Sequence, residues 1–223
     1  RVPNQIFFNK NAVENLRELP SHNTVVVSNP VLEQLGYVDV VRRHLAERTH
    51  VHVLTIPDRE PDQATVLEGV AVLEAFEADQ IVALGGGSVI DAAKIMKLKY
   101  ESPEADLEEL AAPFLDLRKR VVEYPSITGK KRRSRLVAIP TTSGTGTEVT
   151  PFAVMMAEGG RRKITLADYS LTPDAAIVDP QFVMRLPRSI TADTGADCLT
   201  HALEALVSIF ASVYTDSNAM QAA

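Results

Sequence analysis

Apolar runs rich in β-branched residues alternate with segments of helical periodicity along most of the chain. The runs Thr24–Ser28, Val51–Leu54 and Gln80–Leu84 are typical of strands buried on both faces of a parallel sheet. The stretches Val31–Ala46 and Pro61–Phe76 have the periodicity of helices. Strands that alternate with helices in this way indicate βαβ units, so the sequence predicts an α/β fold with a mostly parallel sheet.

The same patterns place the remaining elements. Further strands are expected at Ile6–Phe8, Leu136–Ile139, Phe152–Met156, Lys163–Leu166 and Ala175–Val178. Those from Phe152 onward look like a β meander that turns at Glu158–Gly160. Short helices are expected at Ala12–Leu19, Glu104–Leu110 and Phe114–Val122. The basic run Lys130–Arg135 could attract a phosphate, but a solvated loop is the interpretation that we favour.

The character of the sequence changes after Arg188, where it becomes helical and rich in alanine. We therefore expect two domains, an α/β domain at residues 1–186 and the beginning of an all-helical domain at residues 187–223. The chain starts at Arg1, and no helix-ending signal precedes Ala223. We accordingly expect the sequence to be a fragment of a longer protein.

A glycine-rich turn joins the third buried strand to a helix. Gly85–Ser88 follows the strand directly, and the helix continues through Asp91 and Lys94. Such a turn lets the backbone approach a phosphate, whose charge the exposed N–H groups and the helix dipole favour. The spacing is not the G-x-G-x-x-G fingerprint. A purely structural alternative therefore stays open, in which Ser88 caps the helix and Asp91 completes a capping box.

A second loop, Pro140–Thr150, is dense in hydroxyl groups and glycine and follows the strand Leu136–Ile139. Open α/β sheets bind ligands at the carboxyl ends of their strands. Two such loops at two strand ends indicate a dinucleotide crevice, whereas the alternative is a plain polar loop, because Thr and Gly also favour turns.

Near the end of the chain, Asp197 and His201 stand four residues apart in a helical segment. Side chains at this spacing share a helix face, so an oxygen and a nitrogen can converge on one divalent ion such as zinc or iron(II). A catalytic metal site normally has at least three protein ligands, so others must come from elsewhere. The alternative is that Thr194 and Asp197 form a helix-capping box and that His201 is an ordinary helix residue.

Composition narrows the classes of function. The 223-residue chain has a net charge of −6, which argues against nucleic acid or an anionic membrane as a partner. No apolar run reaches the roughly 20 residues of a membrane span, and no signal-peptide pattern opens the sequence. The single cysteine, Cys198, excludes an internal disulfide. We therefore expect a cytoplasmic protein.

Three motifs, taken in order, resemble the iron-containing alcohol dehydrogenase family. They are Gly85-Gly86-Gly87-Ser88-x-x-Asp91-x-Ala93-Lys94, Pro140-Thr141-Thr142-Ser143-Gly144-Thr145 and Asp197-x-x-x-His201. The segments Asp91–Met96, Leu117–Arg120 and Leu166–Asp174 are similar to the alcohol dehydrogenase half of bifunctional aldehyde–alcohol dehydrogenases. This resemblance covers essentially the whole chain. It implies a Rossmann-like dinucleotide-binding domain followed by the start of an all-helical metal-binding domain, the dehydroquinate synthase-like architecture.

The resemblance also implies ligands and a reaction. The implied ligands of NAD, or of NADP, are Asn29, Gly86, Gly87, Ser88, Asp91, Thr141, Thr142, Thr145, Thr150, Phe152 and Lys163. Those of Fe²⁺, or of Zn²⁺, include Asp197 and His201. The implied reaction is hydride transfer between a primary alcohol, ethanol first, and its aldehyde. The implied assembly is a homo-oligomer that forms filaments within a larger bifunctional chain.

This sequence departs from the family pattern at two functional positions. Asn29 stands where NAD-using members commonly carry an aspartate, which predicts a relaxed choice between NAD and NADP because an amide does not repel a 2′-phosphate. The family's two further histidine ligands lie beyond the end of this chain. We therefore predict that these 223 residues bind metal weakly and have little dehydrogenase activity.

Two other classes of function remain open. One is a metalloenzyme similar to glycerol dehydrogenase or dehydroquinate synthase. The other is a non-catalytic chain that binds a nucleotide or serves in assembly.

Overall fold

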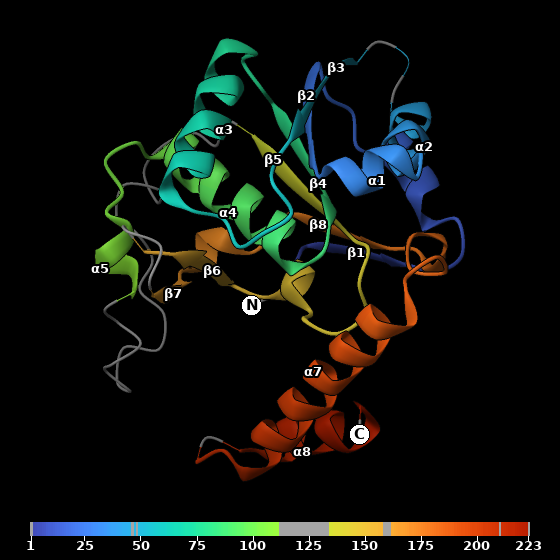
Figure 1. Cartoon of the computed structure of the whole chain (residues 1–223), viewed down its shortest axis with the longest axis vertical. Helices are drawn as coiled ribbons and strands as arrows, with labels where there is room; N and C mark the ends of the chain where they lie inside the picture. Colours follow the sequence, from blue (N-terminus) through green and yellow to red (C-terminus); the bar gives the residue numbers. More distant parts are fainter. Residues whose placement is uncertain are drawn as a thin grey trace.

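A six-stranded parallel sheet forms the centre of the computed structural model, which describes residues 2–45, 47, 49–111, 134–157, 162–209 and 211–222 (Figure 1). The strands are β1 (Gln5–Phe8), β2 (Asn23–Ser28), β3 (His50–Thr55), β4 (Gln80–Gly85), β5 (Arg135–Pro140) and β8 (Ala175–Val178). Their order across the sheet is β1-β8-β5-β4-β2-β3, and each neighbouring pair is parallel. The predicted α/β fold is confirmed.

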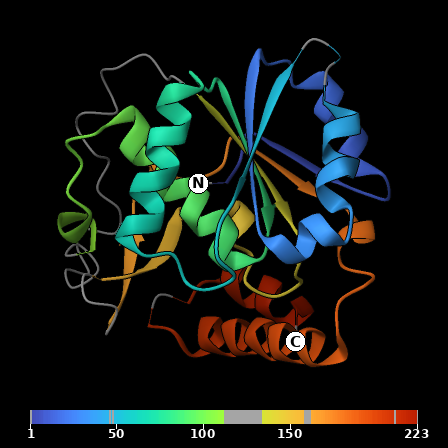
Figure 2. The same ribbon diagram turned by 45° about the horizontal axis from the view of Figure 1, so that its top comes forward.

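Helices cover both faces of this sheet (Figure 2). One face carries the 3₁₀ helix η1 (Ala12–Glu18), α1 (Pro30–Gln34) and α2 (Tyr37–His44), and the other carries α3 (Gln63–Ala75) and α4 (Gly87–Glu101). Val25 and Val27 of β2 pack into the core beneath α3 and α4, whereas Val26 packs into the opposite core. All three valines are fully buried, which explains why the strand reads as a continuous apolar run.

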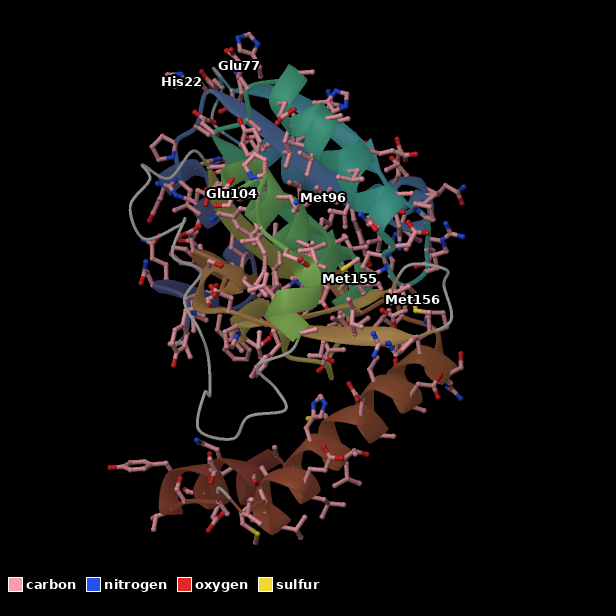
Figure 3. All side chains as sticks on the ribbon, turned by 90° about the vertical axis from the view of Figure 1, so that its left-hand side faces the viewer. His22, Glu77, Met96, Glu104, Met155 and Met156 are labelled. Atoms are coloured by element: carbon pink, nitrogen blue, oxygen red, sulfur yellow. The ribbon has the colours of Figure 1, made fainter. Side chains whose placement is uncertain are left out.

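A small antiparallel hairpin lies beside α4. It consists of β6 (Phe152–Met156) and β7 (Lys163–Ala167). Met155 of β6 and Met96 of α4 belong to the same core (Figure 3). The expected meander is wrong beyond this hairpin, because β8 returns to the main sheet and pairs in parallel with β1 and β5.

Several helices differ from the predicted spans. The expected helix Val31–Ala46 is interrupted at Gly36, whose φ of +76° ends one helix and begins the next. The segment Ala12–Glu18 forms a 3₁₀ helix, and α5 (Leu107–Ala111) begins later than expected. Three predicted features lie outside the described residues: the helix at residues 114–122, the basic run at 130–133 and the turn at 158–160.

Two helices, α7 (Arg188–Val207) and α8 (Val213–Ala222), pack against each other beneath the carboxyl ends of the sheet strands (Figure 2). Their only buried residues are Ala202 and Ala219 within the part of the chain that the structure describes. Large apolar side chains are exposed along them, at Leu199, Leu203, Val207, Val213, Tyr214 and Met220. No described helix is both long enough and apolar enough to cross a membrane.

Candidate nucleotide and metal site

The glycine turn connects β4 to α4 at the carboxyl edge of the sheet. Helix α4 begins at Gly87, with Gly86 as its N-cap, so its first N–H groups have no side-chain cap. A Cβ added to Gly86 would lie 3.2 Å from Cγ2 of Thr142, and one added to Gly87 would lie 3.2 Å from Cγ2 of Thr145. The two predicted loops therefore pack directly on each other, and the absence of side chains keeps the helix terminus accessible.

The capping-box alternative for this turn is wrong, because Asp91 bonds elsewhere. Its carboxylate accepts hydrogen bonds from the hydroxyl of Thr147 and from the backbone N–H of Val154, the latter at 2.9 Å. Asp91 thereby joins α4 to the loop after β5 and to β6, and Ser88 is left inside the first helical turn rather than at its cap.

Lys94, one turn further along α4, completes a buried polar cluster. Its Nζ donates to Oγ1 of Thr147 at 2.8 Å, to the carbonyl of Phe152 at 2.6 Å and to the carbonyl of Thr150 at 3.1 Å, and it lies 3.8 Å from Oδ1 of Asp91. The Lys94 side chain is fully buried. These bonds fix the backbone between β5 and β6, so the ammonium group acts as an internal brace for that loop.

Burial dominates the ionisation of this cluster. It lowers the pKa of Lys94 from 10.5 to about 8, and the attraction of Asp91 opposes that shift. Burial likewise raises the pKa of Asp91, against the opposing effects of Lys94 and Thr147. The pKa of Glu148 is raised by burial as well. Lys94 and Asp91 each favour the charged form of the other and so oppose the effect of burial on both pKa values.

A cavity of about 680 Å³ brings most of the predicted site residues together. Nine of them line it: Gly87, Ser88, Asp91, Thr145, Thr150, Phe152, Lys163, Asp197 and His201. Sequence reasoning missed four further lining residues, which are Glu60, Thr147, Val154 and Thr165. Among these, Glu60 forms an ion pair with the predicted cofactor ligand Lys163 at 2.7 Å.

Four predicted cofactor residues do not line this cavity: Asn29, Gly86, Thr141 and Thr142. Gly86 and Thr142 are neighbours of each other through the close approach described above, and Gly86 directly precedes the lining residue Gly87. Thr141 is buried, and its N–H donates to the carbonyl of Gly85 at 3.0 Å. Asn29 is buried at the end of β2, where its side chain caps α1 by accepting from the N–H of Leu32.

Asp197 and His201 face the same cavity from α7. Oδ1 of Asp197 and Nε2 of His201 are 3.6 Å apart, and both side chains are about half exposed. The capping alternative is wrong here too, because α7 begins at Arg188 and Thr194 lies inside it, where its hydroxyl donates to the carbonyl of Ile190. An oxygen and a nitrogen donor at this separation are suited to one divalent ion. Within the described residues no group of three or more potential metal ligands is found.

The loop after β5 touches α7 at one backbone contact. A Cβ added to Gly144 would lie 2.2 Å from the carbonyl oxygen of Thr194, so only glycine allows this approach. The contact brings α7, with Asp197 and His201, against the loop after β5.

Comparison with known proteins identifies the family. Residues 3–180 match the sequence family described as iron-containing alcohol dehydrogenase. The chain belongs to the iron-containing alcohol dehydrogenase family. The match to this family ends before α7, and so it does not itself include Asp197 or His201.

Individual relatives extend the likeness over the rest of the chain. Aldehyde-alcohol dehydrogenase 2 of Entamoeba histolytica is 50% identical over 100% of this chain, which covers 26% of that protein. The NADPH-dependent butanol dehydrogenase of Clostridium saccharobutylicum is 38% identical over 99% of this chain and 55% of its own length. The iron-containing alcohol dehydrogenase of Thermococcus thioreducens superposes with a TM-score of 0.86 at 27% identity, over 99% of this chain and 57% of that structure. The chain thus spans between about a quarter and a little over half of the length of these relatives.

Proposed function

We propose that this chain is the nucleotide-binding part, together with part of the metal centre, of an alcohol dehydrogenase. The reaction is the interconversion of a primary alcohol, with ethanol as the first candidate, and its aldehyde by hydride transfer with a nicotinamide cofactor. The observation that carries the proposal is the shared cavity, which the glycine turn of α4 and the Asp197–His201 pair line together. The 50% identity to an aldehyde-alcohol dehydrogenase favours this substrate class over that of a glycerol dehydrogenase or a dehydroquinate synthase.

The chain's own groups divide the work of holding the cofactor. The first N–H groups of α4, at Gly87 and Ser88, bind the pyrophosphate, because the helix terminus carries unsatisfied donors and a positive dipole end. Thr145 and Thr150 offer hydroxyl groups along the cavity, while Phe152 offers a ring. Lys163 is positioned at the cavity by its ion pair with Glu60, and its ammonium group binds a hydroxyl or phosphate oxygen of the nucleotide.

Asp197 and His201 are proposed as two of the ligands of a divalent metal, Fe²⁺ first and Zn²⁺ second. Their donor atoms suit such an ion, and they lie in the cavity that receives the nucleotide. When bound, the metal supplies Lewis-acid polarisation of the substrate oxygen. The role of the chain is to hold the two donors beside the nucleotide, so that the reacting carbons are brought together rather than left to diffuse.

The proposal includes the division of the chain into a dinucleotide-binding domain at 1–186 and the start of an all-helical metal domain at 187–223. It also includes a cytoplasmic homo-oligomer that can form filaments within a larger bifunctional chain. The exposed apolar side chains of α7 and α8 support burial of these helices against further protein.

Titration of the 223-residue chain with NADH, followed by nucleotide fluorescence, tests the nucleotide site. Gly87→Ala places a methyl group between the helix terminus and Thr145, so we expect NADH to bind at least about tenfold more weakly. Gly195→Ala is the matched control, because a Cβ there meets no described atom within 4 Å. Undetectable binding by the unaltered chain, or an equal loss in both variants, contradicts the proposal.

A further inference from the structure

Two neighbouring strands leave the sheet side by side at its carboxyl edge. Ser28 of β2 is paired with Thr55 of β3, and the N–H of Ile56 donates to the carbonyl of Ser28 at 2.8 Å. Asn29 follows β2 directly and Asp58 lies three residues after the end of β3, and the side chains of the two residues are in hydrogen-bond contact. On the other side of β2 lies β4, whose end is the glycine turn, so this edge continues directly from the proposed pyrophosphate site.

The Asn29 side chain orients the carboxylate of Asp58 through a hydrogen bond. Oδ1 of Asn29 accepts from the N–H of Leu32 at 3.0 Å, and its Nδ2 donates to Oδ1 of Asp58 at 3.0 Å. Asn29 is only 7% exposed, and both ends of its amide are engaged. The amide therefore serves to orient a neighbouring carboxylate rather than to present itself to a ligand.

Asp58, in contrast to Asn29, is exposed, and its second oxygen, Oδ2, has no hydrogen-bond partner within the part of the chain that the structure describes. Two residues further on, Glu60 lines the cavity. The segment that carries Asp58 thus leads from the end of β3 into the proposed nucleotide site.

We propose that Asp58, oriented by Asn29, selects NAD(H) against NADP(H). This inference rests on the proposed nucleotide site and concerns the adenosine ribose. A carboxylate at the strand edge beside the glycine turn accepts hydrogen bonds from ribose hydroxyls, whereas it repels a 2′-phosphate at the same place. The expectation of relaxed cofactor choice considered only the residue at position 29. The geometry points instead to a carboxylate supplied by the adjacent strand.

Affinities for NADH and NADPH, measured side by side with the 223-residue chain, test this selection. We expect the unaltered chain to bind NADH at least about tenfold more tightly than NADPH, a difference of about 1.4 kcal/mol, because the carboxylate repels the 2′-phosphate. Asp58→Asn keeps the shape and can still accept from Nδ2 of Asn29, but it removes the charge. In this variant NADPH binding strengthens about tenfold and NADH binding weakens severalfold, so the ratio of the two affinities shifts by more than tenfold toward NADPH.

Asp39→Asn is the matched control, because it removes the same charge from an exposed position on α2. It leaves the NADH-to-NADPH ratio unchanged. Asp58→Ala is the second variant, and it also shifts the ratio toward NADPH. Equal binding of both cofactors by the unaltered chain, or a ratio that neither Asp58 variant moves, overturns the inference while the nucleotide site stands. Failure to bind either cofactor overturns the proposed function itself.

Discussion

The two sides of the cavity are built in opposite ways. On the sheet side, Asp91 and Lys94 are buried and bonded to the loop after β5 and to β6. On the α7 side, Asp197 and His201 are half exposed and contact each other across one helical turn. The proposed nucleotide side is therefore fixed by hydrogen bonds within the chain, whereas the proposed metal side lies on a helix whose large apolar residues are mostly exposed. This difference predicts that the same kind of substitution has very different consequences on the two sides.

The strongest test of this contrast is Lys94→Met. This change leaves the carboxylate of Asp91 buried without its counter-charge and removes the hydrogen bonds of Lys94 to the loop after β5 and to the carbonyl of Phe152 in β6. We expect a loss of about 3–5 kcal/mol in the free energy of unfolding, measured by urea titration. Lys163→Met is the matched control, since Lys163 is exposed and its pair with Glu60 is worth less than about 1 kcal/mol. Equal losses in the two variants would show that the cluster is not a brace.

The second test compares the stability of the unaltered chain with that of Lys94→Met as the pH is raised. Lys94 releases its proton near pH 8 in the folded chain but only near 10.5 when unfolded, because burial lowers its folded pKa. A lowered pKa means that the charged form opposes folding. The free-energy penalty of burying the charged ammonium group is complete below pH 8 and disappears between pH 8 and 10.5. The stability of the unaltered chain relative to Lys94→Met should therefore rise over this window, by at most about 3 kcal/mol. A stability difference that is independent of pH contradicts the assignment.

The smallest effect is expected on the α7 side. His201→Ala should change the free energy of unfolding by less than about 0.5 kcal/mol, because the ring is about half exposed and its polar contact is with the equally accessible carboxylate of Asp197. The unaltered chain should keep well under one iron or zinc per chain after dialysis, since two donors seldom hold a metal tightly. Elemental analysis decides this point, and one retained equivalent would show that the described pair is already sufficient.

Much of the fold could be predicted because its signals are local. The run Thr24–Ser28 is a buried strand in any α/β arrangement, and the glycines at 85–87 mark a strand–helix turn without further information. The pairing of β8 with β1 could not be predicted, because it joins residues about 170 positions apart through backbone bonds that any sequence can make. The break at Gly36 was missed for the opposite reason, since the helical periodicity continues across it.

The candidate site shows the same division between local and distant information. Spacing alone placed Asp197 and His201 on one helix face, and the structure confirms that they lie together. Spacing also suggested a capping role for Asp91, but a buried carboxylate takes the best donors that the fold brings to it, which here are Thr147 and Val154. The role proposed for Asp58 carried no sequence signal, because its contact with Asn29 arises from the pairing of β2 with β3.

The close approach of Gly144 to Thr194 has a mechanical consequence. With no space for even a methyl group between loop and helix, α7 cannot slide or roll toward the sheet without pushing the hydroxyl-rich loop ahead of it. If the proposed function holds, a nucleotide bound at the loop and a cation bound at Asp197 and His201 would be coupled through this contact, so that filling one half of the cavity would set the alignment of the other.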